Sequence, residues 1–216
     1  MTGVQTCALP IYIVISAPGG GADGNIGAIV TDLTLYGIYP NDKEELVAYL
    51  SLKSGGTVTF FNVGVKKVLP TDEIKKGFIE NTNGLALLDI FGIKQALFCD
   101  TFNGKLAEGH KIDVWHQMSG TQQAKLKKLL ESGIGWGFHV IHKLPSECKS
   151  IAIDKKYMVA AATPTSCVLY YGGKTGKGKR IDIEIETKKY KLKLNFRDTA
   201  GAGGYPSHLL GDFTYL

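Results

Sequence analysis

The alternation of apolar and polar residues is clearest near the end of the chain, where it predicts a regular β-hairpin. Ile181, Ile183 and Ile185 alternate with acidic residues, and the apolar positions of the following run alternate with lysines. A period of two places the apolar side chains of a strand on one face and the polar ones on the other. Acids and lysines on the polar face can pair across the two strands, so these lysines are expected to be partly neutralised.

The same reading along the rest of the chain predicts an α+β protein. Strands are expected at 12–16, 28–36, 46–53, 58–65, 137–144, 155–163 and 166–173. Helices are expected where apolar residues recur at a spacing of three or four, at 71–77, 85–91 and 119–133. These elements predict a single domain with a central mixed β-sheet, a few helices in the middle and a β-rich C-terminal third over 134–216.

The first eleven residues are set apart from this domain. The segment 1–11, MTGVQTCALPI, resembles the translation of a DNA-sequencing adapter. The alternative is an ordinary N-terminal strand with a turn at Pro10. On the adapter interpretation, the natural N-terminus is expected to be missing and Cys7 carries no meaning. The domain is then expected over 12–216, with its functional core in 12–65.

Composition excludes several classes of protein. A hydrophobic content of 44% and a charged content of 21% are typical of a soluble globular chain. No apolar run reaches the ~20 residues that cross a bilayer, so no membrane partner is expected. Apart from Cys7, the cysteines are the widely spaced Cys99, Cys148 and Cys167, which argues against a disulfide framework or a zinc knuckle. A reducing cytoplasm is the expected location.

Positive charge gathers in the last third of the chain. The net charge is +5, and the stretch 146–197 holds twelve Lys or Arg against five Asp or Glu, a difference of +7. A basic region suits a nucleic-acid partner, and it equally suits a solubilising surface.

An acid and a lysine on two neighbouring predicted strands carry the main chemical hypothesis. Hydrolysis of a phosphodiester with Mg²⁺ uses carboxylates to hold the metal and a nearby lysine to orient water or stabilise charge. Asp32 belongs to the strand predicted at 28–36, and Lys53 ends the next one. Strand alternation puts Ser51 and Lys53 on one face and Leu52 in the core. A surface ion pair between Asp32 and Lys53 is the alternative.

The stretch from Val30 to Asn62 resembles the PD-(D/E)XK nuclease superfamily, which includes restriction endonucleases. The resemblance makes Asp32 the first acid and metal ligand, and Lys53 the catalytic lysine. It implies a Mg²⁺-dependent DNA endonuclease, with DNA as partner, and is compatible with a homodimer. Part of this stretch is also similar to tailed-phage proteins, which suggests a phage or metagenomic source and a cytoplasmic location in a bacterial or phage-infected cell.

The sequence departs from the superfamily pattern at Ser51, where an Asp or Glu is usual. Ser51 is expected to take the place of this acid in an active site with Asp32 and Lys53, although a hydroxyl is a weaker ligand for a hard cation than a carboxylate. Glu44, Glu45 or an acid in the missing N-terminus could replace it. Otherwise the site binds without cutting, which leaves a non-catalytic DNA-binding or virion-associated phage protein as the alternative function.

A glycine- and lysine-rich loop near the C-terminus is the predicted contact with the DNA backbone. The segment 172–180, GGKTGKGKR, resembles a P-loop, but it lacks the first glycine of that pattern and the helix that follows it. Flexible lysines suit contacts with phosphate. An ordinary exposed hairpin loop is the alternative, and for Asn62 a turn. The predicted DNA-binding residues are Asn62, Lys174, Lys177, Lys179 and Arg180.

Three other patterns are weaker. The glycines at 19–24 satisfy a dinucleotide-binding spacing, but a strand-like run follows where a helix is needed. His139 and His142 are three apart in a predicted strand and so point to opposite faces, which is poor geometry for a metal. His110, Asp113 and His116 flank a predicted loop where a metal site is conceivable.

Overall fold

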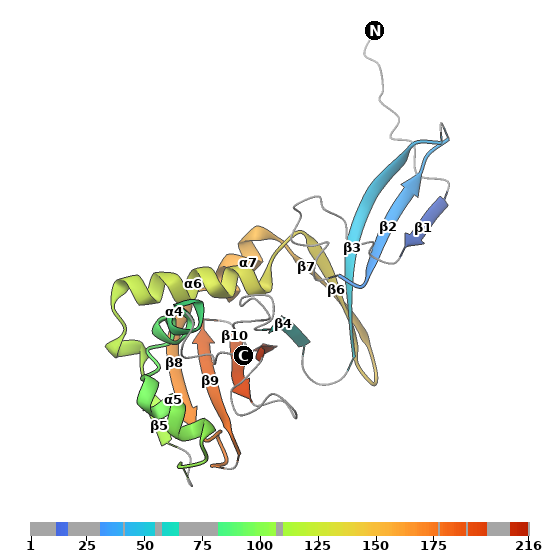
Figure 1. Cartoon of the computed structure of the whole chain (residues 1–216). Coiled ribbons are helices and arrows are strands. Elements are labelled where there is room, and N and C mark those ends of the chain that lie inside the picture. The colour runs from blue at the N-terminus through green and yellow to red at the C-terminus, as the bar shows by residue number, and fades with distance from the viewer. Residues whose placement is uncertain are drawn as a thin grey trace. The chain divides into compact units, whose positions relative to one another are not determined.

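The computed structural model describes most of the chain, and its contacts group into two compact units (Figure 1). The described residues are 12–16, 31–40, 42–54, 58–64, 82–106, 110–176, 178–188, 190–197 and 208–215. For β1, β4 and β11 the description covers the backbone. Unit 1 comprises Met1–Gly56 and Gly135–Tyr157, and unit 2 comprises Thr57–Ile134 and Met158–Leu216. The predicted α+β class is confirmed, and a single domain over 12–216 stays a prediction.

Unit 1 is built on a five-stranded mixed sheet of order β1-β2-β3-β6-β7. Its strands are β1 (Tyr12–Ser16), β2 (Leu33–Ile38), β3 (Glu44–Ser54), β6 (Phe138–Lys143) and β7 (Cys148–Ile153). The pair β3–β6 is parallel, and the other neighbours are antiparallel. The mixed sheet predicted from the sequence is therefore present in this unit.

The β2–β3 hairpin sets the register of the candidate site. Asp42 lies in its turn with a φ of 57°, a conformation that Asp and Asn adopt more readily than most residues. From this turn, the two strands pair antiparallel up to Leu33, which lies opposite Leu50. A short antiparallel connection therefore brings the residues before β2 next to the end of β3.

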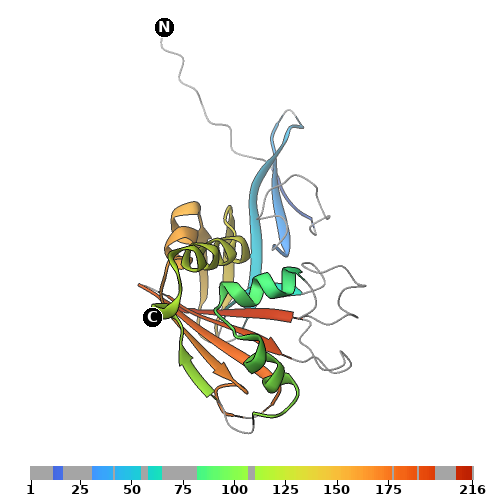
Figure 2. The same ribbon diagram turned by 60° about the vertical axis from the view of Figure 1, so that its left-hand side comes forward.

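Unit 2 contains a six-stranded antiparallel sheet of order β4-β11-β10-β9-β8-β5. Its strands are β4 (Val58–Gly64), β5 (His110–Asp113), β8 (Pro164–Tyr171), β9 (Arg180–Thr187), β10 (Tyr190–Arg197) and β11 (His208–Tyr215). The helical elements are α4 (Thr82–Ile90), α5 (Gln95–Phe102), the short 3-10 helix η2 (Trp115–Gln117) and α6 (Gly120–Ile134). Figure 2 shows α4 and α5 on one side of the fanned strands.

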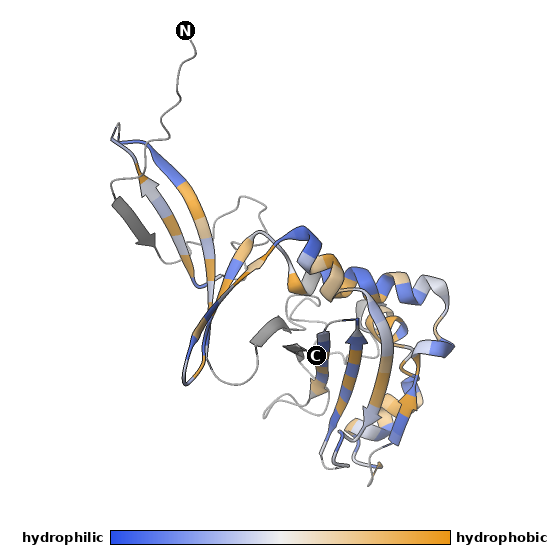
Figure 3. Ribbon diagram, turned by 180° about the vertical axis from the view of Figure 1, so that it is seen from behind, coloured by the Kyte–Doolittle hydropathy of each residue, from blue (hydrophilic) through white to orange (hydrophobic). Residues whose placement is uncertain are grey.

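The core of unit 2 lies between these helices and the apolar face of the sheet. Phe196 of β10 meets Phe91 and Phe98 edge to face, with ring centroids 6.0 and 6.3 Å apart. All three rings are fully buried. On the sheet, Ile181, Ile183 and Ile185 are equally buried, as the alternating pattern predicts. The bands of contrasting hydropathy along β9 and β10 in Figure 3 follow this alternation.

The strand predicted at 155–163 is wrong, because residues Lys155–Ala161 form helix α7. The backbone N–H of Tyr157 donates to the carboxylate Oδ1 of Asp154 at 2.6 Å, an N-terminal cap for the helix. Met158 and Ala161 are buried three residues apart, which is helical spacing. The apolar run therefore follows a period near 3.6 rather than 2.

Several predicted features lie outside the described residues. These are the segment 1–11, the glycines at 19–24, the helix predicted at 71–77, Lys177, and the side chain of Asn62. Among the helices that the structure does describe, none has the length and apolar character needed to cross a bilayer.

Candidate functional site

Asp32 lies one residue before β2, at the point where the β2–β3 ladder ends. Its own N–H donates to the carbonyl of Leu50 at 2.8 Å. The backbone N–H of Leu52 donates to Oδ2 of Asp32 at 2.6 Å. The carboxylate thus accepts a hydrogen bond that a backbone carbonyl would accept if the ladder continued. The Asp32 side chain is therefore fixed to the backbone of β3, even though about 50% of it is exposed.

The three residues predicted to form the active site come together at this carboxylate. The hydroxyl of Ser51 donates to Oδ2 of Asp32 at 3.4 Å. The ammonium of Lys53 lies 3.8 Å from the same oxygen, and its side chain is 22% exposed. Asp32 and Lys53 thus form an ion pair, which both the nuclease hypothesis and its alternative of a surface ion pair predict.

The faces of β3 differ in part from the prediction. Ser51 and Lys53 share a face, as expected, but Ser51 is 2% exposed and Leu52 is 46% exposed. The prediction that Leu52 lies in the core is therefore wrong. The parallel neighbour β6 explains the burial of Ser51, because Val140 lies opposite it in register and is fully buried.

A residue that sequence reasoning missed lies beside Lys53. His142 of β6 is opposite Lys53 in the parallel register and is 6% exposed. His139, three residues earlier, lies on the other face, as the strand spacing predicts. Nothing in the sequence places His142 here, since the β3–β6 pairing joins segments that are distant in the chain.

The donors around Asp32 leave one carboxylate oxygen for a cation. Oδ2 accepts from β3, whereas Oδ1 has no hydrogen-bond partner among the described residues. Mg²⁺ is commonly held by one or two carboxylates together with waters and substrate phosphates. A half-exposed aspartate with one open oxygen fits that requirement for a first ligand.

The two acids that the sequence offers as replacements, Glu44 and Glu45, do not join Asp32. Glu44 and Glu45 lie opposite Ile38 and Gly37, at the far end of the hairpin. Glu45 and Leu50 are five residue steps apart along β3, which is roughly 17 Å. Neither of these acids can therefore replace the missing one. The described residues include no group of three or more His, Cys, Asp or Glu arranged to hold a metal.

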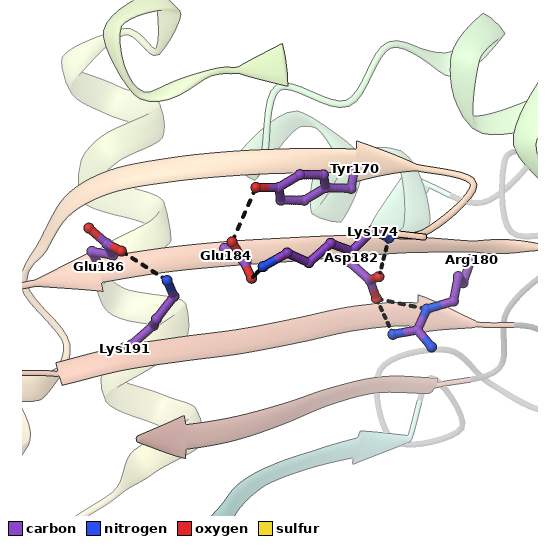
Figure 4. A network of polar contacts seen from close by, with 7 residues as sticks. All are labelled: Tyr170, Lys174, Arg180, Asp182, Glu184, Glu186 and Lys191. Carbon is purple, nitrogen blue, oxygen red and sulfur yellow. Dashed lines mark hydrogen bonds and ion pairs between the residues drawn. The ribbon is translucent and has the colours of Figure 1, made fainter. Parts of the chain in front are cut away.

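The predicted DNA-contact loop joins β8 to β9, and two of its cations are held by acids of the same sheet (Figure 4). The ammonium of Lys174 donates to Glu184 at 2.9 Å, and its backbone N–H donates to Asp182 at 2.7 Å. Arg180 donates to Asp182 through Nε at 2.7 Å and through Nη2. Lys179 is exposed and has no ion pair with a described residue.

A glycine is required where this loop folds over the sheet. Gly173 has a φ of 80°, and a Cβ on it would lie 2.9 Å from Cγ of Arg180. Any other residue at 173 would strain the backbone and displace the arginine. The turn therefore fixes Lys174 and Arg180 against Asp182 and Glu184, which lowers their capacity for phosphate contacts.

The charge network perturbs the titration of Glu184. Burial opposes ionisation of this carboxyl, but the hydrogen bond and charge of Lys174, helped by Lys191, outweigh it and lower the pKa of Glu184 from 4.5. In turn, the hydrogen bond and the charge of Glu184 raise the pKa of Lys174. A carboxyl with a lowered folded-state pKa contributes stability above its unfolded pKa, and this contribution is lost as the pH falls through the folded value.

We expect Lys174→Gln to lower the melting temperature by about 2 °C at pH 7 and by less at pH 3. As the pH falls, protonation of Glu184 removes its charge, so the ion pair contributes progressively less. Thermal unfolding followed by circular dichroism at the two pH values measures this. Lys193→Gln is the matched control, because Lys193 lies opposite Glu184 in register without an ion pair to a described residue. An equal shift at both pH values would contradict the assignment.

Two other candidate chemistries do not assemble. His116 Nδ1 lies 3.4 Å from Asp113, while His110 stacks near Tyr171 with ring centroids 6.4 Å apart, so the three residues do not converge. Burial, with a contribution from Asp113, raises the pKa of the Cys167 thiol to about 12. A thiol with that pKa stays protonated at neutral pH and is a poor nucleophile.

Comparison with known proteins gives a weak structural similarity. The sequence matches no protein-family model and no curated protein. Among solved structures, the chain is similar to the restriction endonuclease MspI in complex with its cognate DNA, with 15% sequence identity and a TM-score of 0.34. The match covers 94% of this chain and 71% of MspI. A TM-score of 0.34 is too low to indicate a shared fold, so the proposed function rests on the geometry of the residues around Asp32.

Proposed function

We propose that this protein is a Mg²⁺-dependent DNA endonuclease that hydrolyses phosphodiester bonds, with its active site at Asp32, Ser51 and Lys53. The observation that carries the proposal is the convergence of Ser51, the Leu52 amide and Lys53 on one oxygen of Asp32. These groups fix an acid and an ammonium side by side at the end of a hairpin, where the acid stays open to solvent. Such a pair suits hydrolysis of an anionic ester.

Each residue has a distinct role in the proposal. Asp32 would hold the cation, and Mg²⁺ bound there would supply Lewis-acid chemistry and charge neutralisation. Lys53 presents its ammonium to the substrate phosphate, where it stabilises the negative charge that develops. Ser51 is a positioning residue, since its buried hydroxyl points to Oδ2 of Asp32 and not to the open oxygen.

A second candidate is a DNA-binding protein without catalytic activity. The observation that favours it is that the described residues include no group of three or more His, Cys, Asp or Glu arranged to hold a metal. In that case Lys53 contributes to phosphate binding, and Asp32 only orders the end of β3.

We expect the protein to nick supercoiled plasmid in Mg²⁺, and Lys53→Ala to slow nicking roughly 10- to 100-fold. EDTA should stop the reaction in both cases. Lys43→Ala is the matched control: Lys43 is exposed just before β3, at the other end of the hairpin, where it pairs with Glu45. Gel electrophoresis of the plasmid forms over time gives the rates. If wild-type protein binds DNA but does not nick it, the second candidate replaces the first.

A further inference from the structure

An exposed tryptophan stands in the connection between α6 and β6. Trp136 is 43% exposed, while the other large exposed apolar residues of the described chain, Leu46, Val47, Leu52 and Leu85, are aliphatic. An indole ring gains more from burial than almost any other side chain, so leaving it in water is costly. A flat ring at the surface is suited to stacking on another planar group.

The backbone holds Trp136 in this position. Its neighbours Gly135 and Gly137 both have positive φ values, of 67° and 91°. Gly135 is buried, and Phe138 after the turn is 3% exposed. The N–H of Gly137 donates to the carbonyl of Ile153 at 2.7 Å. Because the residues around it are fixed, the indole is presented by a constrained turn, which lowers the entropy lost on binding.

Two lysines accompany the ring. Phe138 pairs with Ile153 in the antiparallel β6–β7 ladder, so residues before Phe138 approach residues after Ile153, at the start of α7. Lys155 and Lys156 are exposed there and have no ion pair with a described residue. Asp154 is also present, with Oδ1 engaged by the N–H of Tyr157. The segment that follows Ile153 therefore carries two lysines and one aspartate, a net charge of +1.

We propose that Trp136, Lys155 and Lys156 form a stacking platform for an unpaired base of a DNA strand. Proteins that bind single strands combine aromatic rings, on which bases stack, with cations that follow the backbone phosphates. The indole supplies the first component and the two lysines the second. This inference rests on the proposed function in taking DNA as the partner, yet it concerns binding and is measurable without cleavage.

Tryptophan fluorescence tests the stacking directly. The chain has two tryptophans, so Trp115→Phe leaves Trp136 as the sole reporter. In EDTA, a short oligothymidylate is expected to quench its emission by roughly a third or more, and a blunt duplex of equal length to quench it far less. Binding detected by the anisotropy of a labelled strand without quenching would overturn the platform. Equal quenching by the duplex would overturn it as well.

Substitutions separate the contributions of the ring and the charges. Trp136→Ala should weaken binding of the labelled oligothymidylate about 10-fold, and Trp136→Phe should recover most of the loss because a ring remains. Lys155→Gln and Lys156→Gln should each reduce the slope of log affinity against log salt by about 0.7. Lys128→Gln, an exposed lysine on α6, is the control and should leave the slope unchanged. Unchanged affinity in Trp136→Ala would contradict the proposal.

The two proposals can fail separately. Quenching and ring-dependent affinity in a protein that never nicks plasmid would support the platform and remove the endonuclease. If nicking depends on Lys53 but oligothymidylate binding is unchanged in Trp136→Ala, the endonuclease is supported and the platform is removed.

Discussion

Replacing Asp32 with asparagine is expected to reduce Mg²⁺-dependent plasmid nicking on the order of 10³-fold while leaving the protein folded. Asparagine keeps an acceptor for the Leu52 amide, which lies 2.6 Å from the carboxylate in the wild type. It removes the negative charge that would hold the cation and that faces the Lys53 ammonium at 3.8 Å. The backbone at the end of β3 should therefore persist without its metal ligand.

Asp32→Ala distinguishes the structural role from the chemical one. Alanine leaves the Leu52 amide without its acceptor, so we expect a loss of about 1 kcal/mol in the free energy of unfolding in addition to the loss of nicking. Asp42→Asn is the control for Asp32→Asn. It replaces an aspartate with asparagine at the turn of the same hairpin, where a φ of 57° suits asparagine. Nicking by Asp32→Asn at the wild-type rate would show that Asp32 holds no essential cation.

The convergence at Asp32 could be predicted because it depends on local chain geometry. Asp32 and Lys53 are joined by one hairpin, and antiparallel pairing from a tight turn determines which residues meet. The alternation within β3 also put Ser51 and Lys53 on one face. The role of Ser51 as a donor to Asp32 was not predicted, since the superfamily resemblance directs attention to ligation of the metal.

The face of β3 that is buried could not be predicted from its own residues. Leu46, Leu50 and Leu52 alternate with Tyr49, Ser51 and Lys53, which favours a buried leucine face. The structure buries Ser51 instead and exposes Leu52. The neighbour β6 joins β3 in parallel from a segment more than 80 residues away, and no pattern within β3 reports that pairing.

Elsewhere, the strength of the periodic pattern decided whether a prediction held. The β9–β10 hairpin is long and strictly alternating, and Ile183 pairs with Leu194 on its buried face. The segment 155–163 is short and its apolar residues fit either period, so the pattern alone does not distinguish a strand from a helix. The helix signal was present in Asp154, an N-cap residue just before the run.

Replacing Phe196 with alanine is expected to lower the free energy of unfolding by about 3–5 kcal/mol. Phe196 is fully buried and meets Phe91 and Phe98 edge to face, so truncation removes both ring contacts and leaves a cavity between the sheet and the helices. Phe196→Leu retains most of the volume and should cost less than half as much. Urea unfolding measures both changes, and a loss below about 1 kcal/mol in the alanine variant would contradict this packing.

The same variant tests whether the chain unfolds as one domain. Trp115 belongs to unit 2 and Trp136 to unit 1, so variants that retain one tryptophan report each unit by fluorescence. Phe196 lies in unit 2. If residues 12–216 form one cooperative domain, Phe196→Ala shifts the urea midpoint equally for both reporters, because a two-state transition is independent of the probe. A shift confined to Trp115 would show that unit 1, with Asp32 and Lys53, holds its structure independently of the core around Phe196.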